Sequence, residues 1–210
     1  MENINMYKLF SCDINLITEE EYEQELNKIP LLRRRHILSQ KELDDRKRSL
    51  AAEVLTARAV TEFTGGSKPP EIAFGEYGKP YCVNYNVHFN AAHSGRYTVV
   101  AVSGQPIGVD IEEIRPFSAT AAFKILTDVE KDYIMSDEIE KNRQRRFFEL
   151  WCAKEAYLKL TGEGRSSHIK DLPLRCEKGR LISEKNIDIN IDRSISDAVI
   201  AVVQFKKQDK

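Results

Sequence analysis

The residues best suited to chemistry lie in the stretch from Gly108 to Glu112, where acidic and apolar residues alternate. This alternation predicts a half-buried strand, on which Asp110 and Glu112 share one face and the aliphatic residues share the other. The rise of a strand places the two carboxylates about 6–7 Å apart, a distance at which both can ligate one hard cation. The alternative is an exposed acidic strand face, and an isolated Asp-x-Glu favours that alternative.

A second charged pair, Glu155 and Lys159, is spaced i to i+4 in a segment with helical periodicity, so both side chains project from one side of a helix. Apolar residues at helical spacing predict one buried face of this helix: Phe147, Leu150, Trp151 and Leu158. Two interpretations remain open. The pair is a surface ion pair, or Glu155 supplies a third metal carboxylate and Lys159 contacts a phosphate.

Basic residues are concentrated around the first long predicted helix, over 41–63. They are Arg33, Arg34, Arg35, Arg46, Lys47, Arg48 and Arg58. A solvated helix face, balanced by nearby acidic residues, is the commoner meaning of such a run. The functional interpretation is a phosphate site, because a guanidinium matches phosphate oxygens with two parallel hydrogen bonds.

Two glycine-containing turns carry further polar groups. The stretch 75–80 combines two glycines with Lys79 and a proline, which predicts a tight turn where backbone N–H groups and a lysine can approach an anion. After a strand predicted over 88–92, His93 and Ser94 precede another glycine. Neither turn excludes an ordinary surface loop, and no G-x-S-x-G elbow surrounds Ser94 to indicate a hydrolase.

Composition limits the class of protein. The chain has 210 residues, 41% hydrophobic and 31% charged, with a net charge of -1, which is typical of a folded globular protein. Near-neutral charge gives no reason to expect nucleic acid or an anionic membrane as partner. The four cysteines form no C-x-x-C pair, and the N-terminus lacks the pattern of a signal peptide. We therefore expect a cytoplasmic protein.

The predicted elements divide into two similar halves. A helix over 41–63 leads to a strand over 97–103, and a helix over 138–160 leads to a strand over 197–205. This order predicts an α+β fold of two lobes, residues 1–105 and 106–210, each with a long helix packed on a small, mostly antiparallel sheet. A cleft between the lobes is the expected ligand site.

Three stretches together resemble the 4′-phosphopantetheinyl transferases of the surfactin-synthetase-activating (Sfp) type. They are Tyr-Gly-Lys-Pro with His-Phe-Asn-Ala-Ala-His-Ser-Gly-Arg after it, Pro-Ile-Gly-Val-Asp-Ile-Glu, and Phe-Glu-Leu-Trp-Cys-Ala-Lys-Glu-Ala-Tyr-Leu-Lys. Their order and spacing agree over residues 75–164. The resemblance implies an α/β pseudo-dimer fold, with the N-terminal lobe on the 3′-phosphate and adenine side of coenzyme A and the C-terminal lobe on the carrier side.

The resemblance also implies an activity. Enzymes of this family move 4′-phosphopantetheine from coenzyme A to a serine of an apo acyl or peptidyl carrier protein and release 3′,5′-ADP. Mg²⁺, or Mn²⁺ in its place, would be held by Asp110, Glu112 and Glu155, with Glu155, directly or through a metal-bound water, as the hypothetical base for the serine proton. The processes served would be nonribosomal peptide, fatty acid or polyketide synthesis, and we expect a monomer.

Contacts to coenzyme A follow from the same resemblance. Lys79 and Lys159 would contact phosphates. The 3′-phosphate would be held by His93 and Arg48 with one or more of Arg33, Arg34 and Arg35, and Ser94 and Ser49 would add minor contacts. Phe117, Phe123 and Ile125 are candidates for docking the carrier protein, with core packing as the alternative.

Two other functions remain open on the sequence. A metal-dependent phosphohydrolase could use the same carboxylates on coenzyme A or nucleotide anhydrides. A non-catalytic module could bind coenzyme A or a carrier protein, although such a module would not need all three carboxylates. Dependence on an acceptor protein distinguishes the transferase from both.

Overall fold

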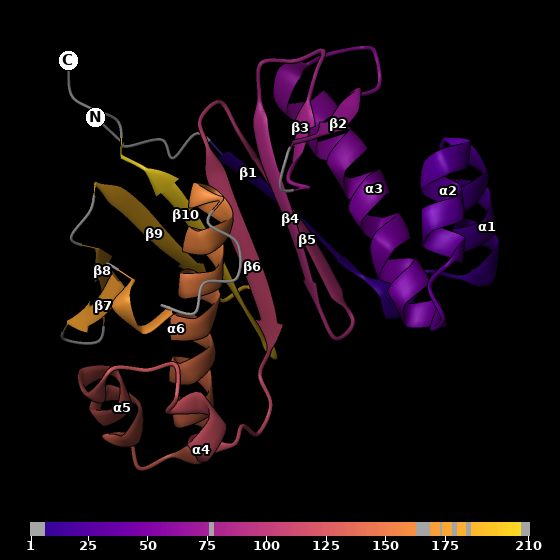
Figure 1. The fold of residues 1–210 in the computed structure, drawn as a ribbon. Coiled ribbons are helices and arrows are strands. Elements are labelled where there is room, and N and C mark those ends of the chain that lie inside the picture. Colours follow the sequence, from indigo (N-terminus) through magenta and orange to yellow (C-terminus); the bar gives the residue numbers. More distant parts are fainter. Residues whose placement is uncertain are drawn as a thin grey trace. The chain divides into compact units, whose positions relative to one another are not determined.

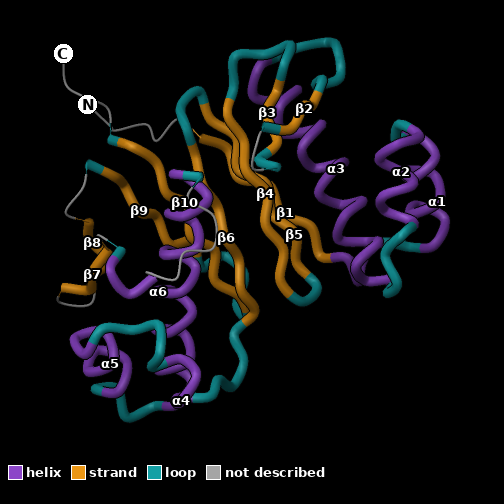
Figure 2. The backbone as a smooth tube through the Cα atoms, viewed as in Figure 1, coloured by secondary structure: helices purple, strands orange, loops and turns teal. Residues whose placement is uncertain are grey.

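The chain folds into two units of helices and antiparallel strands. The computed structural model describes residues 7–75, 78–162, 169–172, 174–177, 180–183 and 186–206. Contacts within the chain separate residues 1–104 from residues 105–210. Figure 1 labels the elements, and Figure 2 shows that each unit contains both helices and strands. The predicted α+β class is therefore confirmed.

The first unit is built on a three-stranded sheet of order β1-β5-β4. Its strands are β1 (Tyr7–Asp13), β2 (Ile72–Phe74), β3 (Pro80–Cys82), β4 (His88–Ser94) and β5 (Tyr97–Ser103). Its helices are η1 (Ile14–Leu16), α1 (Glu19–Lys28), α2 (Leu31–Leu38) and α3 (Leu43–Thr64). Helix α3 packs on the sheet, and Leu55, Ala59 and Val60 join Phe89, Val100 and Val102 in the core.

The second unit repeats this plan with a sheet of order β6-β10-β9. Its strands are β6 (Ile107–Glu113), β7 (Leu174–Glu177), β8 (Arg180–Ser183), β9 (Ile187–Asp192) and β10 (Ala198–Phe205). Its helices are α4 (Ala119–Ala122), α5 (Asp128–Met135), α6 (Glu140–Thr161) and η2 (Ile169–Asp171). Helix α6 packs on β6 and β10, and all pairings among the described strands are antiparallel.

Capping residues place the helix starts where the sequence predicts them. Thr18 and Glu21 form a capping box at α1, and Thr127 and Glu130 form one at α5. Each box satisfies two backbone N–H groups that the first helical turn leaves without partners. The predicted long helices and the strand over 97–103 are confirmed, with helix ends shifted by one to two residues.

Two local predictions differ from the structure, and a third is confirmed. His93 and Ser94, expected in a turn, are the last two residues of β4. The tight turn predicted over 75–80 is confirmed by a hydrogen bond of 2.9 Å from the Gly78 N–H to the Gly75 carbonyl oxygen and by the φ of 75° at Gly78; Pro80 already belongs to β3, and residues 76–77 lie outside the described residues. A separate helix, α2, contains Arg33, Arg34 and Arg35. The sequence did not predict this helix, because Leu31 and Leu32 are exposed and form no buried apolar face.

Gly108 allows α6 to lie unusually close to β6. A Cβ atom built on Gly108 would lie 2.0 Å from the carbonyl oxygen of Ala156 and 2.7 Å from the amide nitrogen of Leu160. Both distances are shorter than any real Cβ contact. Only glycine therefore permits this packing, which brings the last two turns of α6 over the strand that carries Asp110.

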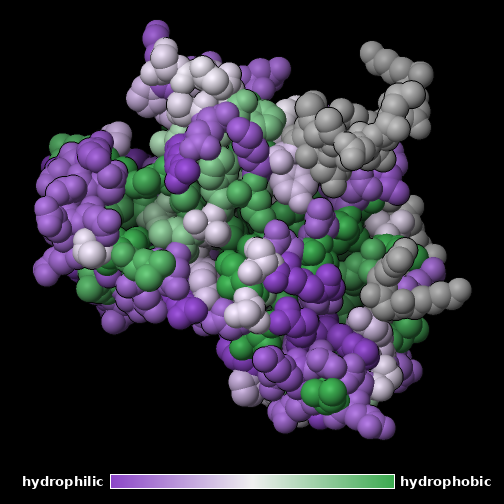
Figure 3. All heavy atoms as spheres, turned by 180° about the vertical axis from the view of Figure 1, so that it is seen from behind, coloured by the Kyte–Doolittle hydropathy of each residue, from purple (hydrophilic) through white to green (hydrophobic). Residues whose placement is uncertain are grey.

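Much of the surface is hydrophilic. Figure 3 shows hydrophilic side chains over much of the face that it draws, together with adjoining patches of hydrophobic side chains. None of the helices in the described part of the chain has the length and hydropathy required to cross a membrane.

Candidate active site

Asp110 lies in the middle of β6, where it is buried. It pairs with Ala201 of β10 in the antiparallel register. Only 7% of Asp110 is exposed, and Val109 and Ile111 on the opposite face are fully buried. This arrangement excludes the interpretation of an exposed acidic strand. A buried carboxylate is costly unless it is paired or neutral, so its surroundings need a specific explanation.

Lys159 of α6 supplies that pairing. Its Nζ donates a hydrogen bond to Asp110 Oδ1 at 2.7 Å, across 49 residues of sequence. The other carboxylate oxygen, Oδ2, is buried without a hydrogen-bond partner in the described structure. Burial raises the pKa of Asp110 to about 6, the Lys159 charge lowers it, and the charges of Glu112 and Glu155 raise it. Three carboxylates and one lysine therefore interact at this position.

Glu112 lies two residues further along β6 and is half-buried. Its Oε1 accepts a hydrogen bond from Trp151 Nε1 of α6, and its Oε2 accepts one from Arg115, each at 3.2 Å. Trp151, predicted only as a core residue, thus also orients a candidate ligand. The signal in the sequence was its position four residues before Glu155, on the same side of the helix.

Glu155 projects from α6 and is partly exposed. Its carboxylate has no hydrogen bond or ion pair with any described residue. Its charge nevertheless contributes to raising the pKa of Asp110, so the two carboxylates influence one another. Lys159 pairs with Asp110, which argues against a simple surface ion pair within the helix.

The cluster contains the oxygen ligands that a hard cation prefers, but these oxygens are not arranged as a metal-binding site. Across the described residues, no three His, Cys, Asp or Glu side chains are arranged to hold a metal ion. The ammonium group of Lys159 provides the positive charge next to Asp110. Two observations nevertheless fit Mg²⁺: all three candidate ligands are carboxylates, and Asp110 Oδ2 is buried without a partner. The metal site stays a prediction.

Cys152 lies beside the same carboxylates in the interior. Its Sγ donates to the carbonyl oxygen of Val199 at 3.5 Å. Burial raises the pKa of the thiol well above its ordinary value, and Asp110 and Glu112 raise it further. A protonated thiol of this kind packs as a small apolar group and does not act as a nucleophile.

In the first unit, Arg48 reaches the hairpin that follows β4. It donates hydrogen bonds to the carbonyl oxygen of Gly95 and to Asp45. Its neighbour Ser49 accepts a hydrogen bond from Gln40 Nε2 at 2.6 Å. His93 is exposed and Ser94 half-buried at the end of β4. The structure therefore brings Arg48 close to the turn that joins β4 to β5, as the predicted 3′-phosphate site requires.

The three arginines of α2 have different surroundings, because successive helix residues point about 100° apart. Arg33 Nε donates to Glu53 at 2.7 Å, and Arg34 donates to the carbonyl oxygen of Ile29 at 3.2 Å. The side chain of Arg35 is exposed and pairs with none of the described residues. The run is therefore not one continuous cationic surface.

Lys79 lies at the other end of β4 from His93. Burial lowers its pKa, and burial followed by the charge of Lys79 lowers the pKa of His88, the first residue of β4. His88 and His93 are five residues apart, which corresponds to roughly 16 Å along a strand. The structure therefore does not gather all predicted phosphate contacts of this unit at one point.

The three candidate docking residues pack against the core of the second unit. Phe117 stacks on Phe147 with ring centroids 4.4 Å apart. Phe123 and Ile125 are partly buried and contact the same core. Core packing thus explains much of their apolar character, and carrier docking stays a prediction.

A buried ion pair next to Glu155 was missed in the sequence. Lys154 Nζ lies 2.8 Å from Glu130 Oε2, and both side chains are 1% exposed. Glu130 also caps α5 through the backbone N–H of Thr127 at 2.8 Å. The pair joins α5 to α6 inside the protein. Their separation of 24 residues gives no local signal, and a lysine is seldom fully buried.

Fold and site together define an α+β protein with a carboxylate–lysine cluster between a strand and a helix. A family model described as the 4′-phosphopantetheinyl transferase superfamily matches residues 106–203, and a model of the N-terminal part of 4′-phosphopantetheinyl transferase matches residues 17–105. The chain belongs to the 4′-phosphopantetheinyl transferase family, as the sequence motifs indicate.

Individual relatives point in the same direction. A 4′-phosphopantetheinyl transferase of Bacillus subtilis is 33% identical over 151 residues, which cover 70% of this chain and 64% of the relative. The 4′-phosphopantetheinyl transferase Sfp of Bacillus subtilis strain 168 is 31% identical over 160 residues, covering 75% and 68%. The matched region therefore spans about two thirds of the length of these relatives.

One solved structure is also similar. The holo-[acyl-carrier-protein] synthase of Thermotoga maritima aligns at 21% identity with a TM-score of 0.40 and covers 49% of this chain and 64% of its own. A likeness at this level adds no argument to the family assignment.

Proposed function

We propose that this protein transfers 4′-phosphopantetheine from coenzyme A to a serine hydroxyl of an apo acyl or peptidyl carrier protein. The observation that carries the proposal is the cluster of Asp110, Lys159 and Glu155 in a chain of this family. A buried carboxylate with an unpartnered oxygen beside a lysine suits a site that binds a cation and a phosphate.

Asp110, Glu112 and Glu155 would hold Mg²⁺, or Mn²⁺ in its place. When bound, the ion would neutralise negative charge on the pyrophosphate of coenzyme A. The support is the all-carboxylate donor set and the unpartnered Oδ2 of Asp110. Trp151 would keep Glu112 oriented, since its indole N–H already donates to one of the two carboxylate oxygens.

Two side chains of this protein would accept the proton and contact the phosphate. The serine oxygen of the carrier forms a bond to the phosphorus of phosphopantetheine, the bond from that phosphorus to 3′,5′-ADP breaks, and the serine proton passes to Glu155. The carboxylate of Glu155 has no partner among the described residues, which suits a proton acceptor. Lys159 would exchange its contact with Asp110 for a phosphate oxygen.

The first unit would bind the nucleotide part of coenzyme A. Arg48 and His93 would hold the 3′-phosphate, and Ser49 and Ser94 would add minor contacts. Arg35 is the most available of the three arginines in α2, because Arg33 and Arg34 have other partners. Lys79, whose pKa is lowered by burial, would contact a second phosphate.

The remaining parts of the proposal concern the partner and the setting. An acidic carrier protein would dock beside Phe117, Phe123 and Ile125. The protein would act as a monomer in the cytoplasm, with no nucleic acid and no membrane as partner.

Intact-protein mass spectrometry of an apo peptidyl carrier protein tests the proposal. The carrier is incubated with coenzyme A, Mg²⁺ and the protein, with EDTA as one control. We expect a gain of one phosphopantetheine, lost with EDTA and in Asp110→Asn. The matched variant is Asp188→Asn, because Asp188 is an exposed carboxylate on β9, and it should retain full activity.

Failure of this experiment has two informative forms. Consumption of coenzyme A without modification of peptidyl, fatty-acyl or polyketide carriers would replace the transferase with a hydrolase. Binding of coenzyme A without either reaction would indicate a binding module. Equal activity of Asp110→Asn and Asp188→Asn would remove Asp110 from the site.

A further inference from the structure

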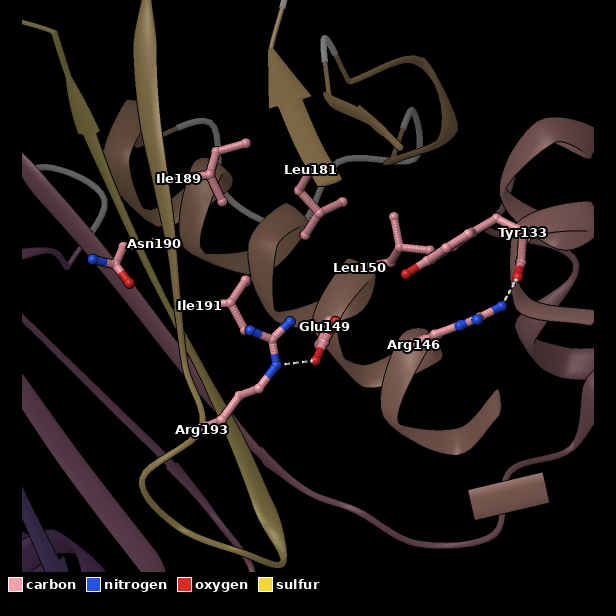
Figure 4. Close-up of a pocket in the computed structure, with 9 residues that line it drawn as sticks. All are labelled: Tyr133, Arg146, Glu149, Leu150, Leu181, Ile189, Asn190, Ile191 and Arg193. Carbon is pink, nitrogen blue, oxygen red and sulfur yellow. Dashed lines mark hydrogen bonds and ion pairs between the residues drawn. The ribbon is translucent and has the colours of Figure 1, made fainter. Parts of the chain in front are cut away.

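A cavity of about 340 Å³ lies in the second unit between α5, α6, β8 and β9. Its volume falls at the lower end of the range for small-molecule sites, roughly 300–1,000 Å³. Figure 4 shows aliphatic side chains from three elements along its wall: Leu150 of α6, Leu181 of β8, and Ile189 and Ile191 of β9. These branched side chains provide an apolar surface for an aliphatic group.

A polar pair lies beside this wall. Arg193 Nε donates a hydrogen bond to Glu149 Oε1 at 2.7 Å, and Figure 4 shows the two side chains meeting over the cavity. The side chain of Glu149 is 10% exposed and that of Arg193 is 53% exposed. Neither makes a further hydrogen bond among the described residues. The two terminal nitrogens of Arg193 and the Oε2 of Glu149 therefore offer donors and an acceptor next to each other.

Charge within the cavity is balanced. Arg193 is compensated by Glu149, and Arg146 at the other end is compensated by Asp137, with Arg146 Nη2 and Asp137 Oδ2 2.7 Å apart. Arg146 also donates to the carbonyl oxygen of Tyr133 at 2.7 Å, as Figure 4 shows. An anionic ligand would meet the Glu149 carboxylate, so a neutral ligand fits this balance better.

We propose that this cavity is a binding site for a small neutral primary amide that carries a branched aliphatic group. The amide carbonyl oxygen accepts hydrogen bonds from the terminal nitrogens of Arg193, and the amide N–H donates to Glu149 Oε2. The aliphatic group packs against Leu181, Ile189 and Ile191. A primary amide presents its carbonyl oxygen and one N–H side by side on the same edge, which matches the polar pair, and the binding leaves neither group unpaired.

The site is separate from the carboxylate cluster of the proposed function. Glu149, which contacts the ligand, and Glu155 are six residues apart on α6, which places them about 120° apart around the helix and about 9 Å apart along it. A ligand in the cavity therefore contacts a different side of α6 from the one that carries Glu155. The proposal does not depend on the transferase activity.

Nuclear magnetic resonance of the ¹⁵N-labelled full chain tests this site with the primary amide 3-methylbutanamide as the probe. We expect saturable shifts of the backbone amides around residues 146–150 and 189–193. Methyl 3-methylbutanoate, which keeps the branched chain and the carbonyl but has no N–H, should bind at least about tenfold more weakly, because Glu149 then lacks a donor. Absence of saturable shifts, or equal affinity for the amide and the ester, would overturn the proposal.

A lysine variant tests the role of Arg193 without removing its charge. Arg193→Lys retains a cation beside Glu149 but loses the fork of terminal nitrogens, so binding of the amide should weaken about tenfold. Arg145→Lys is the matched control, since Arg145 on the same helix donates to the carbonyl oxygen of Ser196 at 3.0 Å, outside the cavity. Unchanged affinity in Arg193→Lys would refute the assignment, and Leu181→Trp, which fills the cavity, should abolish binding.

Discussion

The close packing of α6 on β6 can be tested by adding one methyl group. Gly108→Ala places a Cβ atom 2.0 Å from the backbone oxygen of Ala156, and relief to 3.0 Å requires about 1 Å of movement. The clash is with backbone, so no side chain can rotate away. Overpacking usually costs about 1–3 kcal/mol, and we expect a loss near the upper end or beyond it.

This movement has a second consequence at the site. A displacement of α6 by about 1 Å would lengthen the 2.7 Å contact of Lys159 with Asp110 beyond hydrogen-bond distance. Urea denaturation measures the free energy of unfolding, and Gly104→Ala is the matched control, because a Cβ on Gly104 meets nothing within 4 Å. If Gly108→Ala loses less than about 0.5 kcal/mol relative to Gly104→Ala, the inferred close packing is wrong.

Three further perturbations have defined outcomes. In EDTA, the raised pKa of Asp110, about 6 against 3.8, makes the folded state bind a proton that the unfolded state has lost. The free energy of unfolding should therefore fall by up to about 3 kcal/mol as pH rises from 4 to above 6. Asp110→Asn should abolish that change, and an equal pH dependence in the variant would contradict the assignment. Lys154→Met should lower the free energy of unfolding by about 3–5 kcal/mol, because it leaves the Glu130 carboxylate buried without its ion-pair partner. The double variant with Glu130→Leu should regain most of this loss. Urea denaturation of the single and double variants measures both effects. Thr18→Ala should lower the free energy of unfolding by about 1 kcal/mol through loss of the α1 cap, and an unchanged midpoint would dispute the capping box.

Much of the fold follows from local sequence signals. The run Thr-Val-Val-Ala-Val within 97–103 predicts β5, and Thr18 with Glu21 predicts the start of α1, because each signal is contained within a few residues. The central strand was also predicted, but not the burial of Asp110. That burial depends on α6, which packs on the strand only because of Gly108, and strand periodicity carries no information about a distant helix.

The candidate site shows the same division. The carboxylates and lysines were found from their types and spacing, but their partners were not. The contacts of Lys159 with Asp110 and of Trp151 with Glu112 span 49 and 39 residues. The arginines of α2 looked alike in the sequence, and only the helix geometry separates Arg35 from its neighbours. Contacts between distant elements set these differences.

The buried pair of Lys154 and Glu130 affects how mutational data on this segment should be interpreted. Lys154 and Glu155 are adjacent, yet the lysine side chain is buried and the glutamate is partly exposed beside Asp110. Under the proposed function, substitution of either would lower the yield of product in a cell-based screen, but substitution of Lys154 would do so by reducing the amount of folded protein. A survey that scores growth alone would rank both as equally essential to turnover. Parallel measurement of protein abundance would distinguish a residue needed for stability from a residue needed for activity.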